Sequence, residues 1–258
     1  MAQFPAPKRV AVIGRSKSVL FAMLKKRGMQ LVSSKPDMVV SYGGDGTILY
    51  TEKLFPAVPK LCIRAAKGCA RCTMRHAGGI ELPEHERVFY CLNCIAEALD
   101  AIAAGKAQLL EEPKLLGTVN YTRGGKRRVQ RAIALNEVQI HNKRPTHALR
   151  CRVKVGGETV APVFMGDGVI VATPFGASGY FNAVTRHVFK KGFGIAFNNG
   201  IYHRAPLFLD DLKRKVTIEV IRRHGLFIAD NFESTIVMLE GDYVTIEQAK
   251  DPARFVVT

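Results

Sequence analysis

The sequence lacks the features that would place it in several special classes. No apolar run reaches the roughly 18–20 residues that a membrane-spanning helix needs, and no internal repeat or low-complexity segment is present. The first residues do not have the order of a secretory signal peptide. Hydrophobic residues make up 47% of the 258 residues and charged residues 23%, as in ordinary globular proteins rather than disordered or collagen-like chains. We therefore expect a cytoplasmic protein with a buried core and no membrane segment.

Acidic residues are scarce in this chain. It has 22 Asp and Glu residues against 38 Lys and Arg residues, a formal net charge of +16. Such an excess indicates an anionic partner, such as nucleic acid, a nucleotide, polyphosphate or a membrane surface. The alternative is a composition that only aids solubility or reflects a salt-rich cytoplasm. Residues 113–157 hold eleven basic residues and one acid, Glu137, and in that field we expect the Glu137 carboxyl to be ionised.

The hydrophobic pattern predicts two domains of different class. In the first part, strands at 9–14 and 37–42 alternate with helices at about 17–27 and 47–55, which is the order of a Rossmann-like open α/β sheet. After a helix that ends at Gly105, short β-type runs follow one another, separated by Gly, Pro or Asn, as in a mostly antiparallel β domain. We place the boundary between 1–105 and 106–258.

The sharpest short motif lies between a predicted strand and a predicted helix. It comprises Gly43, Gly44, Asp45, Gly46 and Thr47. Glycines let backbone N–H groups approach phosphate oxygens closely, and the N-terminus of the next helix adds partial positive charge. The aspartate repels phosphate, so it suits a base for an attacking hydroxyl or a partner of magnesium. The same letters also form ordinary turns.

Two further motifs follow in the β-rich part. Asn136 and Glu137 offer donors and acceptors that suit ribose hydroxyls or an adenine edge, although a solvated strand end would look the same. Asp167 precedes a strand that runs into the segment TPFGASGY, residues 173–180. Its small residues permit a close backbone approach, and Tyr180 offers an aromatic face to a base.

In this order and spacing, the three motifs resemble those of the NAD kinase family, over most of the chain. The resemblance implies transfer of a phosphoryl group from ATP or polyphosphate to the 2′-hydroxyl of the adenosine ribose of NAD, with magnesium, and a homo-oligomer. It implies that Asp45 is catalytic and that Gly43, Gly44, Gly46 and Thr47 form the phosphate loop. It further implies NAD contacts from Asn136, Glu137, Asp167, Ser178, Gly179 and Tyr180.

The chain departs from the family pattern in its TPFGASGY segment. The family's TPTGSTAY changes here at Phe175, Ala177, Ser178 and Gly179, and Ala177 loses a hydroxyl. A basic cluster that the family motifs do not cover comprises Arg123, Lys126, Arg127 and Arg128. It is a candidate for contacts to the donor phosphates, or else a solvated hairpin.

Two rival functions remain open at this point. One is a kinase-fold protein that binds nucleic acid through its basic face and through the cysteine-containing loop at about 62–94. Such binding would weaken steeply with rising salt concentration. The other is a GGDG-bearing kinase that acts on a lipid or a sugar, against which the Asn136–Glu137 pair argues.

Four of the six cysteines form two CxxC pairs. Cys69 and Cys72 are separated from Cys91 and Cys94 by eighteen residues, and a spacing of about 15–20 is typical of structural zinc sites. Four thiolates complete a tetrahedral site, so the spacing predicts a zinc-stabilised loop at about 62–94. The alternatives are core thiols at Cys91 and Cys94, or a redox dithiol.

The zinc prediction is testable by elemental analysis of the purified protein under reducing conditions. We expect about one equivalent of zinc per chain, because four thiolates bind the metal tightly at neutral pH. Less than about half an equivalent of metal would contradict the site.

Overall fold

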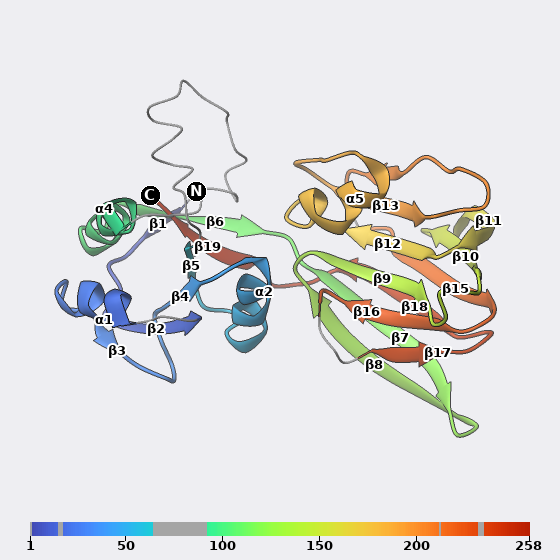
Figure 1. The fold of residues 1–258 in the computed structure, drawn as a ribbon, viewed down its shortest axis with the longest axis horizontal. Helices are drawn as coiled ribbons and strands as arrows, with labels where there is room; N and C mark the ends of the chain where they lie inside the picture. Colours follow the sequence, from blue (N-terminus) through green and yellow to red (C-terminus); the bar gives the residue numbers. More distant parts are fainter. Residues whose placement is uncertain (1, 15–17, 64–91, 212, 232–234) are drawn as a thin grey trace. The chain divides into compact units, whose positions relative to one another are not determined.

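In a computed structural model, the chain forms two compact units (Figure 1). The structure describes all residues except 1, 15–17, 64–91, 212 and 232–234. One unit comprises residues 1–112 and 252–258, and the other comprises residues 113–251. The expected boundary after Gly105 therefore differs from the observed one, and the C-terminal segment belongs to the first unit. The reason is strand pairing: residues 107–112 form a strand of the first unit, beside which the C-terminal strand lies.

The first unit is built on a seven-stranded sheet of order β1-β6-β19-β5-β4-β2-β3. Its strands are β1 (Ala2–Phe4), β2 (Arg9–Gly14), β3 (Gln30–Leu31), β4 (Met38–Tyr42), β5 (Lys60–Ile63), β6 (Ala107–Glu112) and β19 (Ala253–Val257). Strands β3, β2, β4, β5 and β19 pair in parallel, whereas β19–β6 and β6–β1 pair antiparallel. The expected Rossmann-like α/β unit is thus confirmed, with an antiparallel edge.

Helices cover both faces of this sheet. They are α1 (Ser18–Lys25), α2 (Asp45–Leu54) and α4 (Leu92–Ala103). Leu24 of α1 and Leu99 of α4 share a core with Met38 and Val40 of β4. Side chains alternate along a strand, so Ser41 faces the other side, where the Thr51 hydroxyl of α2 donates to it at 3.2 Å.

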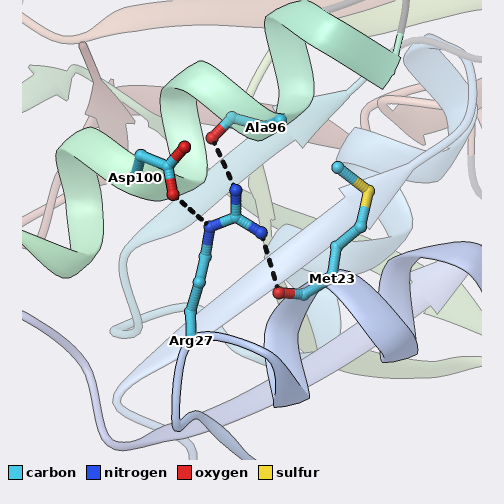
Figure 2. Close-up of polar contacts among 4 residues, drawn as sticks. All are labelled: Met23, Arg27, Ala96 and Asp100. Atoms are coloured by element: carbon cyan, nitrogen blue, oxygen red, sulfur yellow. Dashed lines mark hydrogen bonds and ion pairs between the residues drawn. The ribbon is translucent and has the colours of Figure 1, made fainter.

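One arginine joins the two helices of the first face. The Arg27 guanidinium donates to the Asp100 carboxylate at 2.7 Å, to the Ala96 carbonyl at 3.1 Å and to the Met23 carbonyl at 2.9 Å (Figure 2). Met23 belongs to the last turn of α1, while Ala96 and Asp100 belong to α4. The Arg27 side chain is only 13% exposed, so this contact fixes α4 against α1 and satisfies carbonyls of both helices.

The second unit is a sandwich of two antiparallel six-stranded sheets, which confirms the expected β-rich unit. One has the order β11-β10-β15-β18-β7-β8, from β7 (Leu115–Arg123), β8 (Lys126–Ala134), β10 (Leu149–Val155), β11 (Glu158–Gly166), β15 (Val216–Arg222) and β18 (Tyr243–Gln248). The other has the order β14-β13-β12-β9-β16-β17, from β9 (Glu137–Asn142), β12 (Gly168–Ala172), β13 (Phe193–Asn198), β14 (Leu207–Leu209), β16 (Gly225–Ala229) and β17 (Ile236–Met238).

The core of the second unit lies between the two sheets. Val119 and Ile246 of one sheet share a hydrophobic cluster with Val138, Val171 and Ile195 of the other. A π-helical turn, η2 (Ala177–Phe181), and a short helix, α5 (Asn182–Thr185), pack on the outer face of β12 and β13. Among the described residues, no helix is both long and apolar enough to cross a membrane.

The Arg27 contact predicts a stability effect. Replacing Arg27 by Ala removes charge-assisted hydrogen bonds from a largely buried guanidinium, so the free energy of unfolding should fall by about 1–3 kcal/mol. Urea unfolding measures it. Lys26→Ala at the exposed neighbouring position is the matched control and should change stability by less than about 0.5 kcal/mol. Equal effects of the two substitutions would contradict the role of Arg27.

Candidate functional site

In the first unit, the glycine motif forms the turn between β4 and α2. The Gly43 N–H donates to the Ile63 carbonyl at 2.9 Å, which ties the turn to the end of β5. A Cβ at Gly43 would lie 2.1 Å from the Thr47 hydroxyl, so only glycine fits there. Gly44 is the N-cap of α2 and contributes no side-chain hydrogen bond. The turn therefore leaves the positive end of the helix dipole without a capping side chain from its N-cap residue.

Asp45 is the first residue of α2 and is exposed, as are Gly44 and Gly46, while Thr47 is half-buried. A carboxylate at this place is stabilised by the helix dipole. The motif thus combines an accessible carboxylate with backbone N–H groups at a helix N-terminus, where phosphate oxygens bind readily.

In the second unit, Asn136 and Glu137 lie at the start of β9. The neighbouring strands β12 and β16 both end beside this point. Glu137 opens β9 and pairs with Ala172, the last residue of β12. Ala229, the last residue of β16, pairs with Val138. The residues that follow β12 and β16 are therefore neighbours of Glu137. We call residues 135–137, with Thr173 and Asp230, the Asn136–Glu137 corner.

Asp230 organises this corner. Its carboxylate accepts the backbone N–H groups of Leu135 at 2.9 Å, Asn136 at 2.8 Å and Glu137 at 3.2 Å. Its own N–H donates to the Glu137 carbonyl at 2.9 Å. Asp230 has a φ of 52°, a left-handed conformation that Asp tolerates better than most residues. No sequence motif marks Asp230, because only its position after a strand sets it apart.

The turn after β12 packs against the same corner. The Thr173 hydroxyl donates to the Leu135 carbonyl at 2.6 Å and accepts the Gly176 N–H at 3.1 Å. A Cβ at Gly176 would lie 2.4 Å from the Asn136 carbonyl oxygen, so a larger residue would displace Asn136. The first and fourth residues of the TPFGASGY segment thus fix the backbone of the Asn136–Glu137 pair.

The side chains of Asn136 and Glu137 keep unused acceptor atoms. Among the described residues, the buried Asn136 Oδ1 and Glu137 Oε2 have no hydrogen-bond partner. A buried acceptor without a donor is unfavourable by about 1–3 kcal/mol, and ligand hydroxyl groups would relieve that penalty. Glu137 is only 7% exposed.

Glu137 is less readily ionised than its basic sequence neighbours led us to expect, because it is buried. Desolvation raises the pKa of its carboxyl to about 8, and the neighbouring Asp230 carboxylate raises it further. The eleven basic residues of 113–157 surround Glu137 in sequence, but burial outweighs them. Near neutral pH the carboxyl is therefore protonated in a large fraction of molecules, and it can donate as well as accept a hydrogen bond.

Asp167 lies at the opposite end of the same strands. The Asp167 carboxylate accepts the side-chain N–H groups of Asn142 and Asn199, each at 2.9 Å. Gly168 pairs with His141 and Ala172 pairs with Glu137, so the length of β12, about 13 Å at 3.3 Å per residue, separates Asp167 from the corner. No sequence motif marks these two asparagines.

Tyr180 links η2 to that second end. Its hydroxyl accepts the Asn198 side-chain N–H at 2.8 Å, and Asn198 pairs with Gly168. Ser178 and Gly179 are exposed on the same turn. Residues 177–181 form this π-helical turn, within which Gly179 has non-helical backbone angles.

The basic cluster occupies the β7–β8 hairpin, whose Gly124 and Gly125 turn has φ of 58° and 71°. Lys126, Arg127 and Arg128 are exposed on the edge strand β8 and Arg123 on β7. Arg127 lies 3.7 Å from the buried Asp242 carboxylate, which also accepts the Thr122 hydroxyl at 3.1 Å.

Of the predicted zinc ligands, Cys69, Cys72 and Cys91 lie outside the described residues, and Cys94 is buried on α4. The part of the chain that the structure describes holds no group of three or more His, Cys, Asp or Glu side chains arranged to bind a metal. Zinc stays a prediction.

Curated relatives of the chain are NAD kinases. The chain is 27% identical over 248 residues to the NAD kinase of Shouchella clausii (strain KSM-K16), covering 86% of this chain and 81% of the relative. It is 29% identical over 195 residues to the NAD kinase of Geobacillus stearothermophilus, covering 71% of this chain and 64% of the relative. The second match thus spans slightly less than two thirds of that relative. No family model matches the chain.

Solved structures match almost the whole chain. The yeast NADH kinase complexed with NADH matches with a TM-score of 0.77 and 15% identity, over 99% of this chain and 84% of that one. The NAD kinase from Archaeoglobus fulgidus in complex with ATP matches with a TM-score of 0.72 and 20% identity, over 96% and 92%. The chain has the NAD kinase fold. Within that fold, the glycine loop belongs to the α/β unit and the Asn136–Glu137 corner to the β unit.

The raised pKa of Glu137 predicts a pH-dependent stability. The group ionises near pH 4.5 when unfolded and near pH 8 when folded. Its stabilising contribution is therefore full below about pH 4.5 and is lost as pH rises to about 8. Glu137→Gln removes this titration. The free energy of unfolding of the variant relative to wild type should rise across that window, by about 1.4 kcal/mol per unit of pKa shift.

Urea unfolding at several pH values across the window measures this difference. Glu240→Gln at an exposed position is the matched control. A difference between Glu137→Gln and wild type that does not change with pH would contradict the raised pKa.

Proposed function

We propose that this chain is an NAD kinase that transfers a phosphoryl group to the 2′-hydroxyl of the adenosine ribose of NAD or NADH. The observation that carries the proposal is the Asn136–Glu137 corner. Its two buried oxygens have no donor among the described residues, and its backbone is held in place by Asp230. Ribose hydroxyls are donors of the size and geometry that such a corner requires. The curated relatives support the same activity, since they are NAD kinases.

The glycine motif would bind the phosphoryl donor. Backbone N–H groups at the start of α2 suit the phosphate oxygens of ATP, and the ATP complex of the Archaeoglobus fulgidus enzyme is consistent with that donor. Polyphosphate carries the same phosphate groups and remains the alternative donor. The basic residues of the β7–β8 hairpin, Arg123 to Arg128, are exposed and would contribute charge to either donor.

Asp45 would act as the base. The ribose 2′-oxygen forms a bond to the γ-phosphorus of ATP while the bond from that phosphorus to the bridging oxygen breaks. ADP leaves, and the hydroxyl proton passes to the Asp45 carboxylate. The Asp45 carboxylate is exposed at the start of α2 and is accessible for this role.

Magnesium would accompany the ATP phosphates. Mg²⁺ in such sites is bound by substrate phosphates with one or two carboxylates and water, and a single exposed carboxylate at Asp45 fits that mode. When bound, the ion would neutralise negative charge on the phosphoryl group that is transferred. This chain's own residues position the phosphates at the α2 N-terminus and the ribose at the Asn136–Glu137 corner.

The dinucleotide would extend along β9 and β12. Asp167, together with Tyr180, lies at the far end of these strands from Glu137, and the two asparagines that bind the Asp167 carboxylate fix it for contact with the nicotinamide end. Ser178 and Gly179 are exposed on η2 and are candidates for the adenine side.

The test of this function is an NADP-forming assay with ATP, magnesium and NAD. Asp45→Asn should lower the rate of NADP formation by about 10²–10⁴-fold, the typical contribution of a general base. The thermal unfolding midpoint should fall by no more than about 4 °C, because the exposed Asp45 contributes only its charge at the helix N-terminus, about 0.3–1 kcal/mol. Asp210→Asn, at an exposed position of the second unit, is the matched control and should keep wild-type activity. Absence of NADP from wild-type protein with ATP and with polyphosphate would overturn the proposal.

A further inference from the structure

A second concentration of cations lies in the β-rich unit, in two turns at one end of the sandwich. Lys143, Arg144 and His147 belong to the turn between β9 and β10, and Arg223 and His224 to the turn between β15 and β16. These five residues line a cavity of about 210 Å³. All five are basic, and we call this cavity the basic pocket.

The two turns are joined, so the pocket is a built feature rather than a chance approach of long side chains. The Lys143 N–H donates to the His224 carbonyl at 3.0 Å, and the His147 N–H donates to the Arg144 carbonyl at 3.0 Å. The buried Asn142 side chain donates to the His147 carbonyl at 3.2 Å. Arg223 holds a left-handed φ of 74°. These contacts fix the backbone from which the cations project.

No carboxylate among the described residues forms an ion pair with the arginines or the lysine of this pocket, Arg144, Arg223 and Lys143. Asp167, which shares Asn142 with the pocket, has both carboxylate oxygens engaged by asparagine side chains. Like charges held close together repel one another. An anion bound in the cavity would be attracted to all of them and would offset that repulsion.

The volume of the cavity limits the size of the ligand that it can hold. Pockets for drug-sized or dinucleotide ligands occupy about 300–1,000 Å³, whereas 210 Å³ suits a compact anion. Arginine forks bind phosphate oxygens in pairs, and lysine binds them as a point charge. Two arginines with one lysine match an anion that carries several phosphate oxygens, and the two imidazoles add further N–H donors.

The basic pocket is separate from the Asn136–Glu137 corner. Glu137 opens β9 and Asn142 ends it, which places the two ends roughly 16 Å apart. Side chains alternate along a strand, so Asn142 shares its face with Val138 and Ile140 of the core and Glu137 lies on the other face. A ribose bound at the corner therefore lies too far away to contact this second group of cations.

We propose that the basic pocket binds a diphosphate group, either as free pyrophosphate or as the diphosphate of a nucleotide. This second phosphate site accounts for part of the positive charge that the kinase reaction itself does not require. Its ligand makes its contacts with Lys143, Arg144 and Arg223, all of which belong to the second unit.

The test uses the two pocket histidines as local reporters in the full-length protein. Their imidazole NMR signals, assigned with His147→Gln and His224→Gln, are followed during titration with inorganic pyrophosphate and with ADP at constant ionic strength. We expect saturable shifts of both signals. Arg144→Gln combined with Arg223→Gln should raise the midpoint about tenfold or more, equivalent to at least about 1.4 kcal/mol.

A matched variant controls for charge alone. Lys25→Gln combined with Lys26→Gln also removes two positive charges, from exposed positions at the end of α1 and directly after it, and should leave the midpoint within about twofold. A response to both pyrophosphate and ADP supports the diphosphate group as the ligand, and a response to ADP alone assigns it to a nucleotide.

Three results would overturn the proposal. They are the absence of a saturable shift at millimolar pyrophosphate and ADP, an unchanged midpoint in the arginine variant, and an equal rise in the lysine variant. In a parallel titration, an oligonucleotide that shifts the same signals at lower phosphate concentration, with steep dependence on salt, would assign the pocket to nucleic acid instead. Because the readout is local and needs no turnover, its failure is distinguishable from failure of the kinase activity.

Discussion

The carboxylate of Asp230 is the contact on which the candidate acceptor site depends. It accepts three successive backbone N–H groups, those of residues 135–137, and so turns the chain from β8 into β9 at a fixed angle. Hydrogen bonds to a charged acceptor are stronger than those between neutral groups. The Thr173 hydroxyl and the close approach of Gly176 hold the same segment from the other side. Asn136 and Glu137 are consequently preorganised before any ligand arrives, which lowers the entropic cost of binding.

Burial explains most of the raised pKa of Glu137, and the Asp230 carboxylate adds to it. A buried carboxyl beside a second carboxylate is unfavourable when ionised, and its pKa rises to about 8. The positive stretch around it in sequence does not act on it strongly, because most of those side chains lie on exposed strands and turns. The net charge of +16 is therefore distributed over separate places, of which the β7–β8 hairpin and the basic pocket are two.

Local sequence patterns predicted much of the fold. The glycine motif lies between a strand and a helix as expected, and the change from α/β to antiparallel β is observed. The division of the chain between the two units was harder to predict, because a local sequence pattern does not show with which strands the C-terminal residues pair. β19 pairs with β5 and β6, which are distant in sequence.

The candidate site was predictable only in part, for a similar reason. Asn136 and Glu137 stand out as a pair, but the residue that organises them is 93 positions from Glu137. The charges of neighbouring residues in the sequence do not show whether a side chain is buried. The expectation that Glu137 is ionised was therefore wrong, because its burial raises its pKa. The asparagines that bind Asp167 come from β9 and from the residue after β13, and only the pairing of strands brings them together.

The most direct measurement of the central claim is the identity of the product. Purified protein incubated with ATP, magnesium and NAD can be followed by phosphorus NMR. The account predicts a new phosphomonoester signal from the 2′ position of the adenosine ribose, with one ADP released for each NADP formed. A dinucleotide that remains unmodified with ATP and with polyphosphate, or one phosphorylated at another position, would contradict it.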